Sequence, residues 1–81
     1  MKVEVLLFAS LRDLTGADRL TVELGENASV TDLLDSIADQ HPFLKERVAL
    51  TRVAIDDRFA AAEDLIPPES ELALIPPVSG G

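Results

Sequence analysis

The residues best suited to chemistry lie at the C-terminus, which reads Pro76-Pro77-Val78-Ser79-Gly80-Gly81. Proline favours extended polyproline II backbone and lacks the N–H that a strand ladder needs. We therefore expect residues 76–81 to form an extended, flexible tail beyond a folded domain of residues 1–75. Because glycine has no side chain, the final pair could thread a passage too narrow for other residues. The pattern predicts a tail that carries the carboxylate of Gly81 into the active site of a partner.

A free carboxylate reacts poorly with nucleophiles, because attack on it would have to expel oxide. It becomes reactive once it is activated, for example as a mixed anhydride with AMP. The sequence contains neither a GxxxxGK motif followed by Ser or Thr nor a GxGxxG motif, which are the glycine-rich loops that cradle phosphates. We therefore expect this chain to bind no cofactor, and a partner enzyme to use ATP and magnesium. The alternative is an ordinary chain end or an expression remnant, since a terminal Gly-Gly arises by chance in about 0.5% of chains.

The composition narrows the chemistry further. The chain contains no cysteine, which excludes a thiolate nucleophile, a persulfide, a cysteine zinc site and an iron–sulfur cluster. His41 is the only histidine, and by itself it cannot build a histidine-rich metal site or a catalytic triad. Asp56 and Asp57 are adjacent, which is typical of a tight turn. We expect no metal site in this chain.

The charge and the N-terminal segment indicate where the chain works. A net charge of −8 at pH 7 argues against nucleic acid, whose phosphates require clustered Lys and Arg, and against an anionic membrane surface. The apolar run of residues 3–8 is too short to span a membrane, and Glu4 interrupts it. It also lacks the cleavage pattern of a signal peptide. We expect a cytoplasmic protein that binds neither nucleic acid nor membrane.

The hydrophobic pattern predicts one domain of the α+β class. Apolar residues alternate in several short segments, as in half-buried strands. The expected strands are residues 3–8, 19–24, 51–55, 58–60 and 71–75. Before the third strand, Ser29 and Asp32 fit a helix capping box, and His41-Pro42 ends the helix. This order predicts a ubiquitin-like β-grasp, in which a mixed sheet of four to five strands carries one main helix on one face.

Two apolar side chains are candidates for a surface that docks partners. Phe59 lies in the short fourth strand, which we expect at the edge of the sheet. Ile75 points opposite to Leu72 and Leu74 by the alternation of the last strand. Both could therefore form an exposed apolar patch. Core packing is the alternative for Phe59, and we expect Phe8 in the core.

Both ends of the chain resemble one known family. The segments LLFASLRDLTG and LALIPPVSGG resemble the small subunits of molybdopterin synthase, the MoaD-like sulfur carriers. In that family a first strand ending in Phe-Ala is followed by a Leu-Arg helix and a turn, and the chain closes on Pro-Pro-Val-x-Gly-Gly. The matching features are Phe8-Ala9, Leu11-Arg12, Thr15-Gly16 and residues 76–81.

The resemblance implies a mechanism in which this chain is the carrier and has no activity alone. An E1-like adenylyltransferase would adenylate Gly81, and a sulfur donor protein would convert the adenylate to a thiocarboxylate. The tail would then enter the large subunit, where the active site lies, and give its sulfur to cyclic pyranopterin monophosphate on the route to the molybdenum cofactor. Gly80 and Gly81 would be the reactive end. Arg12 and residues 76–79 would contact partners, although a solvated surface role fits Arg12 equally.

Three other functions share the fold or the C-terminal diglycine. The sulfur carrier for thiamin has the same end but lacks the Phe-Ala-x-Leu-Arg stretch. A ubiquitin-related modifier with a thiocarboxylate end serves another pathway. A ubiquitin-like interaction domain that is never activated belongs to a different class. Reaction with an E1-like enzyme and ATP would separate the activated carriers from the last of these.

Overall fold

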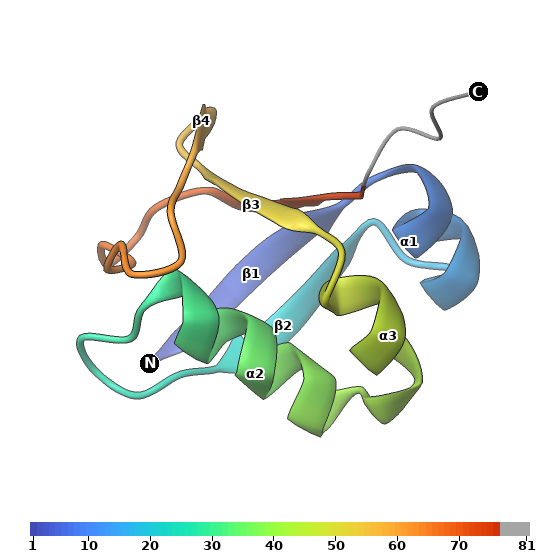
Figure 1. The fold of residues 1–81 in the computed structure, drawn as a ribbon, viewed down its shortest axis with the longest axis horizontal. Coiled ribbons are helices and arrows are strands. Elements are labelled where there is room, and N and C mark those ends of the chain that lie inside the picture. The colour runs from blue at the N-terminus through green and yellow to red at the C-terminus, as the bar shows by residue number, and fades with distance from the viewer. Residues whose placement is uncertain (77–81) are drawn as a thin grey trace.

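A computed structural model describes residues 1–76. Five strands form one mixed sheet in the order β2-β1-β5-β3-β4, and helix α2 lies across one face of it (Figure 1). The elements are β1 Lys2–Leu7, α1 Ala9–Thr15, β2 Arg19–Glu23, α2 Val30–Gln40, the 3-10 helix η1 Pro42–Leu44, α3 Lys45–Val48, β3 Arg52–Ile55, β4 Arg58–Phe59 and β5 Leu72–Ile75. The expected α+β class and β-grasp arrangement are confirmed.

Strand β5 occupies the middle of the sheet. It pairs in parallel with β1, where Leu74 lies beside Leu7, and antiparallel with β3, where Leu74 lies beside Val53. Because β1 and β5 run in the same direction, their C-terminal ends lie at the same end of the sheet. Helix α1 begins at that end of the sheet, directly after β1, and the chain leaves the sheet at the same end after Ile75.

Helix α2 begins at the expected capping box. The Ser29 hydroxyl accepts a hydrogen bond from the Asp32 N–H at 3.2 Å, and the Asp32 carboxylate accepts one from the Ser29 N–H at 2.9 Å. These two bonds satisfy donors that the first turn of a helix leaves unpaired. The helix ends at Gln40, just before His41-Pro42, because a residue that precedes proline is disfavoured in helical backbone.

The hydrophobic core lies between α2, α3 and the sheet face that they cover. Alternate residues of β1, β2 and β5 point into it, together with one stripe of α2. Its members are Val3, Val5, Leu7, Leu11, Val22, Leu24, Ala28, Val30, Leu33, Ile37, Leu44, Val48, Val53, Ile66, Leu72 and Leu74. Within residues 1–76, none of the helices is long and apolar enough to cross a lipid bilayer.

The prediction that Phe8 belongs to the core is wrong. Its side chain is 43% exposed. Phe8 has extended backbone (φ −131°, ψ 159°), so it continues the alternation of β1 and falls on the same side as Leu6, opposite Leu7. That side of the sheet faces away from α2, and the phenyl ring therefore remains at the surface.

The expected turn at Asp56-Asp57 is confirmed. Both residues have left-handed backbone, with φ of 49° and 69°. A two-residue hairpin with positive φ at both positions has the backbone twist that suits antiparallel strands, and Asp tolerates this region better than most residues. The Asp56 carboxylate also accepts a hydrogen bond from the Glu71 N–H at 2.8 Å, which ties the turn to the segment that leads into β5.

Candidate functional site

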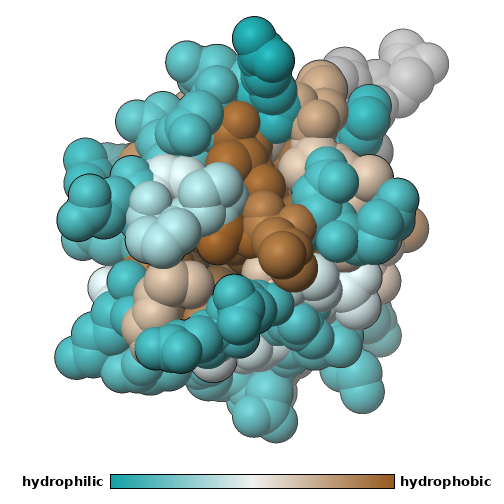
Figure 2. All heavy atoms as spheres, turned by 90° about the vertical axis from the view of Figure 1, so that its left-hand side faces the viewer, coloured by the Kyte–Doolittle hydropathy of each residue, from teal (hydrophilic) through white to brown (hydrophobic). Residues whose placement is uncertain are grey.

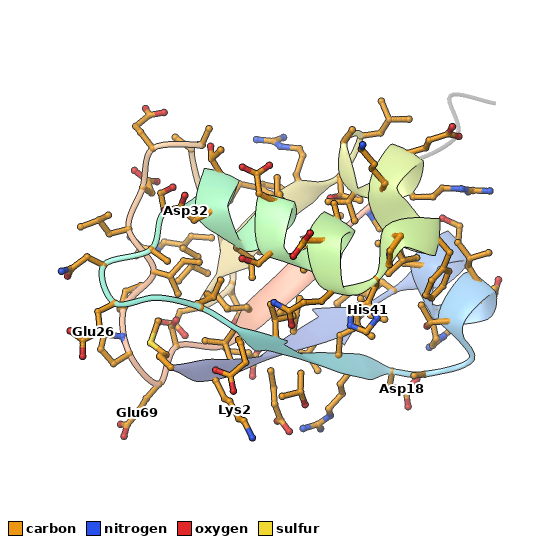
Figure 3. All side chains as sticks on the ribbon, turned by 90° about the horizontal axis from the view of Figure 1, so that it is seen from below. Lys2, Asp18, Glu26, Asp32, His41 and Glu69 are labelled. Atoms are coloured by element: carbon orange, nitrogen blue, oxygen red, sulfur yellow. The ribbon has the colours of Figure 1, made fainter. Side chains whose placement is uncertain are left out.

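The sheet face opposite α2 is the candidate docking surface, and we call it the open face. Figure 3 shows α2 on one side of the sheet and the Lys2 side chain projecting from the other. Apolar side chains from four strands line a shallow depression on this face, with two carboxylates beside them. The lining residues are Leu6, Phe8, Ala54, Asp57, Phe59, Glu71, Ala73 and Ile75. Phe59 and Ile75, the two residues proposed to contact partner proteins, therefore lie in one surface.

Phe59 is the most prominent side chain of the open face. It lies on edge strand β4 and is 57% exposed. The guanidinium carbon of Arg52 lies 4.1 Å from the centre of its ring, which is a cation–π contact. Arg52 pairs in register with Ile75, so it links the exposed ring to the strand that leads into the tail. Of the two alternatives for Phe59, the structure shows the exposed one, and its role in binding a partner stays a prediction.

Sequence reasoning missed Arg52. The signal was its spacing, because Arg52 lies two residues before Ala54 and must share a face of β3 with it. Which face that is, and which strand pairs with β3, depends on the register of the sheet. The antiparallel pairing of Ala54 with Phe59 brings the aromatic ring within reach of Arg52.

The tail begins beside the open face. Ile75 and Pro76 are half-buried, and they follow the buried Leu74 in the central strand. The five residues Pro77, Val78, Ser79, Gly80 and Gly81, all predicted to act in the tail, lie outside the described residues. The structure therefore brings Phe59 and Ile75 to one surface, and Pro76 follows Ile75 directly in the chain. The predictions for residues 77–81 stay predictions.

Arg12 occupies a separate position. It lies on α1, which begins directly after Phe8, and its side chain is exposed. It is not among the residues that line the depression on the open face. Helix α1, which carries Arg12, stands at the end of the sheet where β1 and β5 finish (Figure 1).

A second depression, with a mixed polar and apolar lining, adjoins the first. It is lined by Ile55, Arg58, Phe59, Ala60, Asp64, Leu65 and Pro67. Figure 2 shows the side of the molecule that carries the segment between β4 and β5, with an apolar strip exposed among hydrophilic residues. Leu65 is 59% exposed, and Phe59 lines both depressions. The apolar surface available to a partner thus continues around β4.

The polar side chains of residues 1–76 form neither a buried cluster nor a metal-binding group. Among residues 1–76, no polar or charged side chain is buried. No group of three or more His, Asp or Glu side chains there could hold a metal ion.

Comparison with known proteins identifies the family. The chain matches the ThiS family over residues 5–81, which include both the open face and the terminal glycines. The chain belongs to the ThiS family. The match runs from the middle of β1 to Gly81, so the family relation covers most of the fold and the tail together.

Individual relatives extend over the full chain. The molybdopterin synthase sulfur carrier subunit of Chlamydomonas reinhardtii is 35% identical, with 100% of each chain covered. The protein of the same name from Arabidopsis thaliana is 32% identical over 100% of this chain and 84% of its own length. A crystal structure of SAMP1 from Haloferax volcanii superposes with a TM-score of 0.85 at 34% identity, with 100% of each chain covered.

Proposed function

We propose that this ThiS-family chain is the sulfur-carrier subunit of a molybdopterin synthase. The observation that carries the proposal is the similarity to the sulfur carrier subunit of Chlamydomonas reinhardtii, which runs end to end through both proteins. The exposed apolar face beside the start of the tail supports it, because a carrier must be held by its partners while its end reaches their active sites.

In this proposal the reactive atom belongs to the carboxylate of Gly81. An E1-like enzyme attaches AMP from ATP to this carboxylate and releases pyrophosphate. A sulfur donor then supplies hydrosulfide, whose sulfur forms a bond to the acyl carbon while the bond from that carbon to AMP breaks, so AMP leaves and a thiocarboxylate remains. Within the large subunit, the thiocarboxylate gives its sulfur to cyclic pyranopterin monophosphate, and the tail returns to the carboxylate form. Two such deliveries complete the dithiolene of molybdopterin.

The residues of the open face act by docking. Phe59 and Ile75 would bury their exposed apolar surface against each partner, and this would fix the position from which the tail starts. A chain of six residues from Pro76 to Gly81 reaches at most roughly 20 Å. Each partner must therefore place its active site within about that distance of the end of β5.

A second candidate uses the same activated end with a different acceptor. The curated small archaeal modifier protein 1 of Haloferax volcanii is 34% identical over 98% of this chain and 100% of its own length. Its name describes a modifier, and an acyl adenylate or a species derived from it can also acylate an amine. The two functions differ in product, which is a thiocarboxylate for a sulfur carrier and an amide for a modifier.

Intact mass spectrometry separates these functions. The full chain, without any residue added at its C-terminus, is incubated with the E1-like enzyme and sulfur donor from the same genome, ATP and magnesium. A sulfur carrier gains the mass difference between sulfur and oxygen on Gly81. Covalent attachment to protein amines without this change would favour the modifier, and no change with active enzymes would contradict both. A chain lacking Gly81 is the control.

A further inference from the structure

Strand β2 forms one edge of the sheet, and its hydrogen bonds to β1 determine which of its backbone groups point outward. Met1 and Leu24 exchange two backbone bonds of 2.7 Å, and Leu7 donates to Asp18 at 2.7 Å. In an antiparallel pair, residues that exchange bonds alternate with residues whose backbone groups point away. The register of β1 and β2 therefore directs the N–H and C=O groups of Arg19, Thr21 and Glu23 outward, away from β1.

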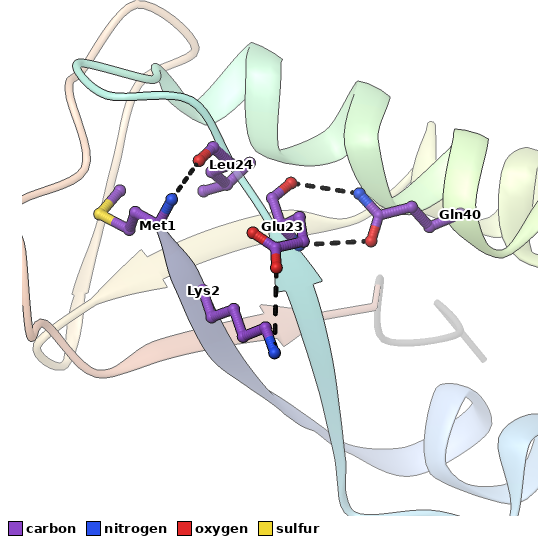
Figure 4. Close-up of polar contacts among 5 residues, drawn as sticks. All are labelled: Met1, Lys2, Glu23, Leu24 and Gln40. Atoms are coloured by element: carbon purple, nitrogen blue, oxygen red, sulfur yellow. Dashed lines mark hydrogen bonds and ion pairs between the residues drawn. The ribbon is translucent and has the colours of Figure 1, made fainter.

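The side chain of Gln40 bonds to one of these three outward-facing residues. Gln40 is the last residue of α2, and its amide bonds to both backbone groups of Glu23 (Figure 4). Its Oε1 accepts from the Glu23 N–H at 3.3 Å, and its Nε2 donates to the Glu23 carbonyl at 3.1 Å. The side-chain amide thus takes the place that a peptide group of a neighbouring strand would occupy. Within residues 1–76, no side chain forms a hydrogen bond of this kind with the backbone N–H or C=O of Arg19 or Thr21.

The sequence of β2 is complementary to itself when two copies run antiparallel. If Thr21 pairs with Thr21 of a second copy, Arg19 lies opposite Glu23 and Leu20 lies opposite Val22. Opposite charges, Thr–Thr pairs and apolar pairs are each favourable across strands. In this register the three outward-facing residues of each copy meet one another, so their hydrogen bonds could all form.

We propose that the β2 edge is a pairing surface for a second copy of this chain, and that Gln40 keeps it closed. With Gln40 in place, an incoming strand loses both bonds at Glu23 and, by symmetry, both at the opposite end. Without it, two sheets join through β2 into one continuous sheet. Unpaired edges invite such association, and folded proteins commonly block them. The inference does not depend on the proposed function.

Sedimentation equilibrium tests the proposal on the full chain. We expect Gln40→Ala to lower the dissociation constant of the dimer at least about tenfold relative to the native chain. Gln40 is exposed, so the variant should remain folded, and a thermal melt confirms this. Protection of the Thr21 amide from hydrogen exchange should appear with the dimer. A Gln40→Ala chain as monomeric as the native one would overturn the proposal.

A mixing experiment tests the register. In the Gln40→Ala background, Arg19→Glu and Glu23→Arg each place like charges opposite each other in a homodimer. We expect both double variants to be monomeric alone. When they are mixed, every pair across the interface becomes opposite in charge, and a heterodimer should form. Homodimers of either variant, or no association after mixing, would contradict pairing through β2.

Discussion

Phe59 lines both depressions, and its substitution is the most direct test of docking. We expect Phe59→Asp to weaken binding to the large subunit about tenfold or more, because exposed aromatic side chains often dominate an interface. The folded domain should lose no more than about 1 kcal/mol, since the ring is largely outside the core and its contact with Arg52 is exposed. Calorimetric titration and thermal melts measure the two effects.

Phe43 provides a matched control. It is 60% exposed, close to the 57% of Phe59, but it lies on η1 and away from the open face. Phe43→Asp should leave the affinity for the large subunit unchanged. Equal losses of affinity in both variants would mean that added negative charge, rather than the open face, is responsible. A large drop in stability with unchanged affinity for Phe59→Asp would place that ring in the core instead.

Alternation along a strand was sufficient to predict on which side of the sheet some side chains lie. Ile75 follows the two-residue period of β5, so its position opposite Leu74 could be inferred from sequence. The same period places Phe8 with Leu6, but assigning that face to solvent requires knowing that a single helix covers only the other one. Arg52 could not be placed beside Phe59 without the pairing of β3 with β4. The register in which separate strands pair cannot be inferred from the alternation within each strand.

At the scale of elements, the capping box of α2 should set the stability of the helix but not the chemistry of the tail. We expect Ser29→Ala to lower the free energy of unfolding by about 1 kcal/mol, because the first turn loses its acceptor. For a domain of this size, that corresponds to a melting temperature about 4–8 °C lower. Sulfur loading of the folded variant should proceed at the native rate.

Ser36 serves as the control for this prediction. It lies within α2, away from either end, so Ser36→Ala should be neutral or slightly stabilising, because alanine is the better helix former. A melting temperature unaffected by Ser29→Ala would show that the capping bonds contribute little. The helix start could be predicted from sequence because it depends on local spacing. The contact of Gln40 with β2 could not, because it joins residues 17 positions apart.

At the scale of the whole molecule, the division between domain and tail predicts how C-terminal changes act. Among residues 1–76, the core residues lie between Val3 and Leu74, and we expect changes at the terminus to leave the melting temperature unchanged. Adding one residue after Gly81 should abolish sulfur transfer, because it moves the carboxylate by about 3.3 Å. Errors of about 1 Å in the position of reacting atoms can cost about 100-fold in rate.

Gly80→Val tests the passage through which the tail is proposed to enter. The variant keeps the length and the carboxylate but adds a branched side chain. We expect a large loss of molybdopterin formation in a reconstituted assay with the large subunit. Transfer at the native rate by both Gly80→Val and the extended chain would rule out a threaded tail.

The central claim is that Gly81 delivers sulfur, and a single-turnover reaction tests it most directly. Chain carrying a C-terminal thiocarboxylate is mixed with the large subunit and cyclic pyranopterin monophosphate, and intact mass is followed together with molybdopterin. The account predicts that the chain returns to its carboxylate form as molybdopterin appears, with two thiocarboxylates consumed for each dithiolene. A thiocarboxylate that persists unchanged beside an active large subunit would contradict it.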